Sequence, residues 1–112
     1  MLILIFLTDC RSELVVNPTD IPHSLSVSFR HLDELLLPED IEWIKNSELD
    51  DLVLLHFSLG MWIRNHWLNQ PNSRIADQLR GMGFITLDGM SQFIIEAYHH
   101  YLNDLDYEVL KP

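Results

Sequence analysis

The chain has 112 residues, of which 47% are hydrophobic and 21% are charged, as expected of one globular domain and not of a disordered chain. Its 17 acidic residues against 7 basic ones give a formal net charge of −10. This charge repels phosphate backbones and anionic membrane surfaces, so it argues against nucleic acid as a partner and favours a basic protein.

The chain begins with the apolar run MLILIFL, which is too short to span a bilayer. Two interpretations stay open: an extended or short-strand arm packed on the helices, or a degenerate export leader. The leader is disfavoured because no Lys or Arg precedes the run, and Thr8-Asp9 stands before Cys10 in place of small residues. As the only cysteine, Cys10 excludes an intramolecular disulfide, which fits a cytoplasmic location. We assign residues 1–20 to an apolar arm and linker, because Pro18 disfavours helix.

Two helices are predicted to follow this linker. Residues 24–36 form the first, because their apolar side chains recur at three- and four-residue steps on one helical face. His23 or Ser24 would be its N-cap. Pro38 is expected at the first position of the second helix, which ends near Asn46, since proline is favoured there. The side chains expected in the core are Leu25, Phe29, Leu32, Leu36, Ile41, Trp43 and Ile44.

A third helix, residues 47–65, is predicted in the centre of the chain. Ser47 and Asp50 are close to a capping box, in which each side chain satisfies a free amide of the first turn. Gly60 stands inside this helix, where glycine costs about 0.5–1 kcal/mol relative to alanine, so we expect a close packing contact there. The residues predicted to share one face are Leu49, Leu52, Val53, His56, Phe57, Gly60, Ile63 and Arg64.

His56, Gly60 and Arg64 are spaced by four residues and form one strip on this helix. In a functional interpretation, the strip and Asn65 form a groove that binds a peptide or a small anion through the guanidinium group. In a structural interpretation, Arg64 hydrogen-bonds carbonyls at the helix end, and His56 is a hydrogen-bonded core residue. We favour the structural interpretation, and a strip sealed in the core would weaken the functional one.

A turn at residues 69–72 precedes two further predicted helices. Ser73 caps a short helix that ends at Gly81. Thr86 or Asp88 begins the last helix, which has a broad apolar face. The residues of that face are Met90, Phe93, Ile94, Ala97, Tyr98, Tyr101 and Leu102.

These elements predict an all-α fold with a single domain. We expect four to five helices at residues 21–105, after the arm at residues 1–20, with a C-terminal tail at residues 106–112 that frays or lies on the surface. No segment is long and apolar enough for a membrane span. The oligomeric state does not follow from the sequence.

No arrangement of residues indicates a catalytic or metal site. Glu96 and His99 have the Glu-x-x-His spacing of di-iron bundles, but the second copy and the further glutamates that such sites need are missing. The sequence has no glycine-rich phosphate loop, no G-x-S-x-G and no H-E-x-x-H. We therefore expect no enzymatic activity, no metal and no cofactor. The remaining alternative is a small enzyme that uses His56, His66 or His99.

Three segments resemble a family of small bacterial helical domains of unknown function. They are IPHSLSVSFRHLDELLLPEDIEWIKN, DDLVLLHFSLGMWIRNHW and SRIADQLRGMGFITLDGMSQFIIEAYHHYLN. The match is fairly specific in the central L-H-x-x-L-G-M-x-I-R-N pattern and in the segment from Gly89 to Asn103. The resemblance covers residues 21–103 and implies a helical domain with no known catalytic role. The chain departs from the family pattern at Leu37, where Ser or Thr is expected, at Gly89, where Asp is expected, and in residues 69–71. These departures concern the loops more than the fold.

The acidic residues fall into two groups. The first group stands in predicted first turns, where helix dipoles favour carboxylates. Its members are Glu39, Asp40, Glu48, Asp50 and Asp51. The second group has no such explanation, and we predict that it forms an acidic partner-binding face, with Trp43 or Trp62 as aromatic anchors. Its members are Asp33, Glu34, Glu42, Asp104, Asp106 and Glu108.

A small acidic protein without catalytic motifs is similar in kind to bacterial immunity proteins, which neutralise basic toxin domains. The similarity implies a non-catalytic protein-binding module, an immunity or antitoxin-like partner of a basic bacterial toxin, with association steered by charge. Two alternatives stay open. The domain is structural or regulatory and binds a peptide or small anion near His56 and Arg64, or its charges only keep it in solution.

Overall fold

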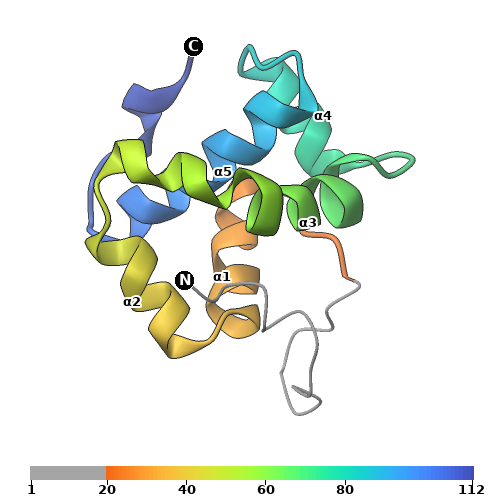
Figure 1. The fold of residues 1–112 in the computed structure, drawn as a ribbon. Helices are drawn as coiled ribbons and strands as arrows, with labels where there is room; N and C mark the ends of the chain where they lie inside the picture. The colour runs from red at the N-terminus through yellow and green to blue at the C-terminus, as the bar shows by residue number, and fades with distance from the viewer. Residues whose placement is uncertain (1–19) are drawn as a thin grey trace.

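The structure, a computed structural model, describes residues 20–112, and within them the chain forms α-helices and no strand (Figure 1). The all-α prediction is confirmed for this part of the chain. The predicted arm up to residue 19, with Cys10, lies outside the described residues. Among residues 20–112, no helix combines the length and the apolarity that crossing a membrane requires. The α-helices are α1 (Leu25–Leu35), α2 (Pro38–Asn46), α3 (Met61–Ile63), α4 (Arg74–Gly81) and α5 (Leu87–Leu102).

The structure confirms the predicted starts of four helices, three by an N-cap side chain and one by a proline in the first turn. The hydroxyl groups of Ser24, Ser73 and Thr86 each accept a hydrogen bond from the backbone amide three residues later, at 3.3, 3.2 and 3.0 Å. Pro38 occupies the first turn of α2. These bonds satisfy amides that have no partner within the helix, which is why local sequence locates these boundaries.

The central part of the chain is helical, as predicted, but it is not a uniform α-helix. We call residues 49–68 the central helical run. It crosses the middle of the molecule in Figure 1 and changes its hydrogen-bonding pattern three times. In order, it consists of the 3₁₀ segment η2 (Leu49–Leu55), the π segment η3 (His56–Gly60), the short helix α3 and the π segment η4 (Arg64–Leu68).

The predicted ends of the central helix are wrong. The run begins after Glu48 and has no side-chain cap, so the expected capping box of Ser47 and Asp50 does not form. The Ser47 hydroxyl instead donates to the Trp43 carbonyl oxygen at 2.6 Å, closing the end of α2. At the other end, the second π segment carries the run to Leu68 rather than stopping at residue 65.

The changing helix type determines which side chains of the run are buried. Hydrogen bonds span three residues in a 3₁₀ helix and five in a π-helix, so the buried positions step first by three and then by four. Val53 and Phe57, placed on the core face by a constant period of 3.6, are instead 60% and 78% exposed. The buried line is formed by Leu52, Leu55, Leu59, Ile63 and Trp67, all fully buried.

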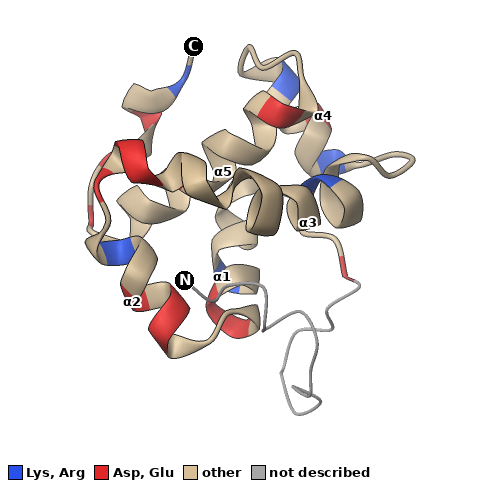
Figure 2. Cartoon of the chain, viewed as in Figure 1, with Lys and Arg blue, Asp and Glu red and all other residues tan. Residues whose placement is uncertain are grey.

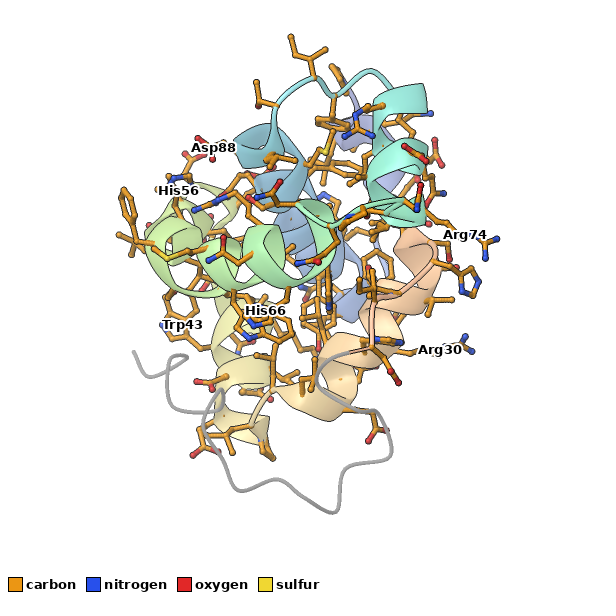
Figure 3. All side chains as sticks on the ribbon, turned by 90° about the vertical axis from the view of Figure 1, so that its right-hand side faces the viewer. Arg30, Trp43, His56, His66, Arg74 and Asp88 are labelled. Atoms are coloured by element: carbon orange, nitrogen blue, oxygen red, sulfur yellow. The ribbon has the colours of Figure 1, made fainter. Side chains whose placement is uncertain are left out.

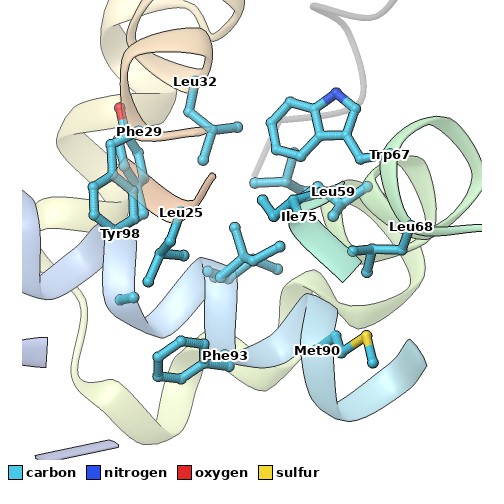
Figure 4. Packing of buried hydrophobic residues seen from close by; sticks show 14 of the residues in the cluster. Leu25, Phe29, Leu32, Leu59, Trp67, Leu68, Ile75, Met90, Phe93 and Tyr98 are labelled. Carbon is cyan, nitrogen blue, oxygen red and sulfur yellow. The ribbon is translucent and has the colours of Figure 1, made fainter. Parts of the chain in front are cut away.

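Helix α5 lies at the centre of the fold, where it contacts α1, α2 and the central helical run. Its predicted apolar face is confirmed between Met90 and Tyr98, which are both buried. Figure 4 shows Leu32 of α1, Trp67 of the central run and Phe93 of α5 around one apolar interior. The core is therefore continuous across these elements.

The C-terminal tail is more ordered than predicted. Residues Tyr107–Leu110 form a 3₁₀ turn, η5. The Tyr107 ring packs edge-on against Phe29 with centroids 5.4 Å apart, and Leu110 also packs against the core. Val109 is 73% exposed, so only part of the tail lies on the surface as expected. The sequence did not predict this turn, because a four-residue turn leaves no helical period in the sequence.

Two histidines are expected to make the fold sensitive to acid. Burial lowers the pKa of His31, whose ring packs edge-on against Trp67 with centroids 6.0 Å apart. Burial, and next the neighbouring His99, lower the pKa of His100. An unfolded histidine titrates near pH 6.5, so below about that pH the unfolded state binds more protons than the folded state. The stability that these groups contribute is therefore present above about pH 6.5 and lost as the pH falls.

We expect the urea midpoint of unfolding to fall between about pH 7.5 and about pH 5. A double variant, His31→Gln with His100→Gln, should show a smaller fall. Equal pH dependence in the double variant and the unmodified protein would contradict this assignment.

Candidate functional site

A groove of about 620 Å³ lies where α2 meets the start of the central helical run. Only Ser47 and Glu48 connect the two elements, so the first turns of the run are held beside the last turns of α2. We call this the Trp43 groove. Its lining residues are Glu39, Glu42, Trp43, Asn46, Ser47, Glu48 and Asp51.

The Trp43 groove is strongly negative. Four of the lining residues are carboxylates, and none of those within residues 20–112 is Lys or Arg. Glu42 is held by a 3.1 Å hydrogen bond that Asn46 Nδ2 donates to its carboxylate. Figure 2 shows the acidic residues over α2 and the start of the central run, and Figure 3 shows Arg30 and Arg74 projecting at the edge opposite Trp43. The four carboxylates of the lining lie close together, which concentrates negative potential at the groove.

Trp43 gives the groove an aromatic wall. The residue is half-buried, because its side chain packs against the core while it also lines the groove. The face of an indole ring attracts a cation, and a carboxylate pairs with the same cation by a charge-assisted hydrogen bond. This combination can hold a lysine or arginine side chain. In the part of the chain that the structure describes, no His or Cys lines the groove.

Sequence analysis found only part of this site. Glu42 and Trp43 were predicted as partner-binding residues, and both line the groove. Glu39, Glu48 and Asp51 were missed, because their positions in first turns already gave a local explanation. The useful signal was the very short connection between two predicted helices, which brings the acidic start of one beside Trp43 on the other.

The strip of His56, Gly60 and Arg64 is packed within the protein. The Arg64 side chain is only 13% exposed. Its Nη1 donates to Ser91 Oγ at 2.9 Å and its Nη2 to the His56 carbonyl oxygen at 3.1 Å. Its Nε lies 3.4 Å from the Asp88 carboxylate, in the first turn of α5. Arg64 thereby ties the central run to α5, rather than bonding the last carbonyls of its own helix.

Gly60 makes room for this guanidinium group. A Cβ atom at Gly60 would lie 3.2 Å from Arg64 Nη1 and 3.2 Å from the Leu55 carbonyl oxygen. The expected packing reason for this glycine is therefore confirmed. Asn65 is exposed. Ligand binding at this strip stays a prediction, and the occupied donors of Arg64 support the structural interpretation.

Asp33, predicted on the partner-binding face, is exposed, and its carboxylate is engaged by hydrogen bonds within the protein. Its carboxylate accepts hydrogen bonds from the hydroxyl groups of Tyr98 at 2.7 Å and Tyr101 at 3.2 Å. Burial, and next the hydrogen bond to Asp33, raise the pKa of Tyr98. Asp33 thus joins α1 to α5, which accounts for it without a partner.

The remaining predicted acidic residues are not among the residues that line the groove. Asp106 caps η5 by accepting a 2.9 Å hydrogen bond from the Glu108 amide, and Glu108 pairs with Lys111 at 2.6 Å. Asp104 lies in the turn after α5 with φ 58°, and Glu34 is half-buried on α1. Of the six predicted carboxylates only Glu42 lines the groove, and a single partner-binding face that includes all six stays a prediction.

Trp62, the second predicted aromatic anchor, is buried. Its exposed fraction is 9%, and its ring stacks on His66 with centroids 4.5 Å apart and meets Trp67 edge-on at 5.5 Å. This prediction is corrected, because the phase of the central run turns Trp62 inward. His99 is also buried, and its Nε2 donates to the Ser47 carbonyl oxygen at 3.0 Å. Among residues 20–112, no three His, Cys, Asp or Glu side chains group as metal ligands would.

Comparison with known proteins gives one match. A family model described as a domain of unknown function, DUF6794, matches residues 21–102. This range agrees with the segments in which the sequence resembles small helical domains. No curated protein and no solved structure matches the chain.

Proposed function

Because the chain belongs to the DUF6794 family, a domain of unknown function, we propose its role from its own geometry: a non-catalytic module that binds a basic segment of a partner protein in the Trp43 groove. The observation that carries the proposal is the groove lining, where four carboxylates share the surface with Trp43 and, among the described residues that line it, no lysine or arginine competes for them. Such a surface complements a segment rich in Lys and Arg.

The contribution of the groove to the binding free energy follows from the strength of its possible contacts. An exposed ion pair is worth about 0.2–1 kcal/mol and an exposed cation–π contact about 0.5–1 kcal/mol. The groove therefore supplies about 1–5 kcal/mol, whereas micromolar affinity requires about 8 kcal/mol. Its role is to steer and orient a basic partner, and tight binding requires a further contact.

The partner class that fits this chemistry is a basic bacterial protein, such as a toxin domain that exposes Lys and Arg for nucleic acid. Covering those side chains would block the toxin, as an immunity or antitoxin-like protein does. The net charge of −10 supports this proposal, because it speeds association with a cationic surface at low salt. The single cysteine is compatible with action in the cytoplasm.

The proposal is tested with a fluorescently labelled octa-arginine peptide, whose binding is followed by anisotropy. The variant Glu39→Gln with Glu42→Gln removes two carboxylates of the groove. We expect its Kd to be about 2-fold to 30-fold higher than that of the unmodified protein. Binding to the unmodified protein should weaken as salt is added, since the pairs are exposed.

The matched control removes the same charge elsewhere. Asp20→Asn with Asp77→Asn changes two exposed carboxylates that lie outside the groove lining and outside the predicted acidic face. This variant should bind the peptide nearly as well as the unmodified protein. Equal weakening in both double variants would mean that the total charge, and not the groove, binds the peptide, and the proposal would fail.

A further inference from the structure

Four apolar side chains of the central helical run are exposed along one side of it. Their exposed fractions are 60% for Val53, 63% for Leu54, 78% for Phe57 and 41% for Met61. We call these residues the apolar stripe. Adjoining exposed apolar side chains on a soluble protein mark an interaction surface, whereas single ones are ordinary.

The apolar stripe begins at the Trp43 groove. Side chains three residues apart eclipse one another in a 3₁₀ helix, so Leu54 lies over Asp51, which lines the groove. Phe57 follows Leu54 by three residues, and Met61 follows Phe57 by four, as the run changes from 3₁₀ to π. The acidic groove and the apolar stripe are therefore neighbouring parts of one surface.

We propose that this surface docks an amphipathic helix of the partner protein, whose apolar face covers the apolar stripe and whose lysine or arginine side chains enter the Trp43 groove. The inference rests on the proposed function and adds the shape and the apolar face of the bound segment. Phe57 is the aromatic residue of the stripe and its most exposed side chain, so it is the central anchor. The carboxylates of the groove form the polar rim.

Charge complementarity selects this occupant over a second copy of the chain. In a dimer through the stripe, the second copy's central helical run would offer Glu48 and Asp51 no available cation, because its one Lys or Arg, Arg64, is 13% exposed and already hydrogen-bonded to Ser91. A basic amphipathic helix places cations against the same carboxylates. Since residues 20–112 contain no strand, the described part of the chain offers no sheet edge for an extended peptide, whereas a helix can pack on a helix.

The probe is a synthetic peptide of about 18 residues with leucine on one helical face and lysine on the other, compared with a scrambled peptide of the same composition. The unmodified protein should bind the patterned peptide more tightly than the scrambled one. Phe57→Ala should raise the Kd for the patterned peptide by about tenfold or more. Ile85→Ala is the control, because Ile85 is 90% exposed and lies outside the stripe, and it should leave the Kd unchanged.

The outcomes separate this inference from the proposed function. If Phe57→Ala has no effect while Glu39→Gln with Glu42→Gln weakens binding, the docking inference is overturned and the groove proposal stands. If neither variant weakens binding, both fail. If sedimentation reveals a dimer that Phe57→Ala dissociates, the occupant is a second copy. If Phe57→Ala lowers only the thermal stability of a monomer, the chain itself covers the stripe. Either of the last two results also overturns the inference.

Discussion

A Trp67→Ala variant is expected to lose about 3–5 kcal/mol of unfolding free energy. Trp67 is fully buried, and its ring meets those of Trp62 and His31 with centroids 5.5 and 6.0 Å apart. Truncation removes these contacts and leaves a cavity among α1, α5 and the central run, which close-packed neighbours can fill only in part. Urea unfolding followed by far-ultraviolet circular dichroism measures the loss.

Two matched variants make the result specific. Trp67→Phe should cost less than Trp67→Ala, because an aromatic ring is kept and the buried indole Nε1 has no hydrogen-bond partner among residues 20–112 to lose. Phe57→Ala removes an aromatic ring from the opposite, exposed side of the same run and should change stability by less than about 0.5 kcal/mol. A loss below about 1 kcal/mol for Trp67→Ala would show that the core is not arranged as described.

An Arg64→Ala variant is expected to lose about 1.5–3 kcal/mol. Its guanidinium group bonds Ser91 on α5 and the His56 carbonyl oxygen on the central run, and the side chain is 13% exposed. Removal leaves partners unsatisfied in a partly buried place, which costs more than losing a surface contact. Arg64→Lys should not restore stability, because one ammonium group cannot replace the planar fork of donors. The measurement is the urea unfolding free energy of each variant.

The contributions of the Arg64 partners can be separated. A double-mutant cycle of Arg64→Ala with Ser91→Ala should give a coupling energy of about 0.5–3 kcal/mol, as expected for residues in contact. Asp88→Asn should cost only about 0.2–1 kcal/mol, because the Asp88 side chain is 70% exposed. If Arg64→Ala left the unfolding free energy unchanged, the hydrogen bonds of Arg64 would not stabilise the fold. The interpretation of the strip of His56, Gly60 and Arg64 as a ligand groove would then regain support.

The sequence predicts those parts of the fold that local hydrogen bonding decides. Ser24, Ser73 and Thr86 satisfy amides within three residues, so their helices begin where the pattern places them. The central helical run differs, because its hydrogen-bonding pattern changes along the chain and a constant period then loses phase. For this reason the sequence analysis placed Val53 and Phe57 on the core face. It did not predict the exposed apolar stripe.

The candidate site was predictable only where no competing local explanation existed. Glu42 stands outside a first turn, so the helix dipole does not explain its charge and we predicted a role in partner binding. It lines the Trp43 groove. Glu48 and Asp51 were assigned to a helix dipole, although the fold brings them to the same groove. The sequence alone does not distinguish Trp43 from Trp62 as an exposed aromatic anchor. Only the packing of the helices shows that one lines the groove and the other is buried.

The central claim, that basic segments bind in the Trp43 groove, is tested most directly by the indole N–H signals in two-dimensional nuclear magnetic resonance spectra. The chain has 3 tryptophans, and Trp62 and Trp67 are buried whereas Trp43 lines the groove. During titration with the octa-arginine peptide, the Trp43 indole signal should shift progressively while the other two stay nearly fixed. A titration that shifts signals elsewhere and leaves Trp43 in place would contradict the account.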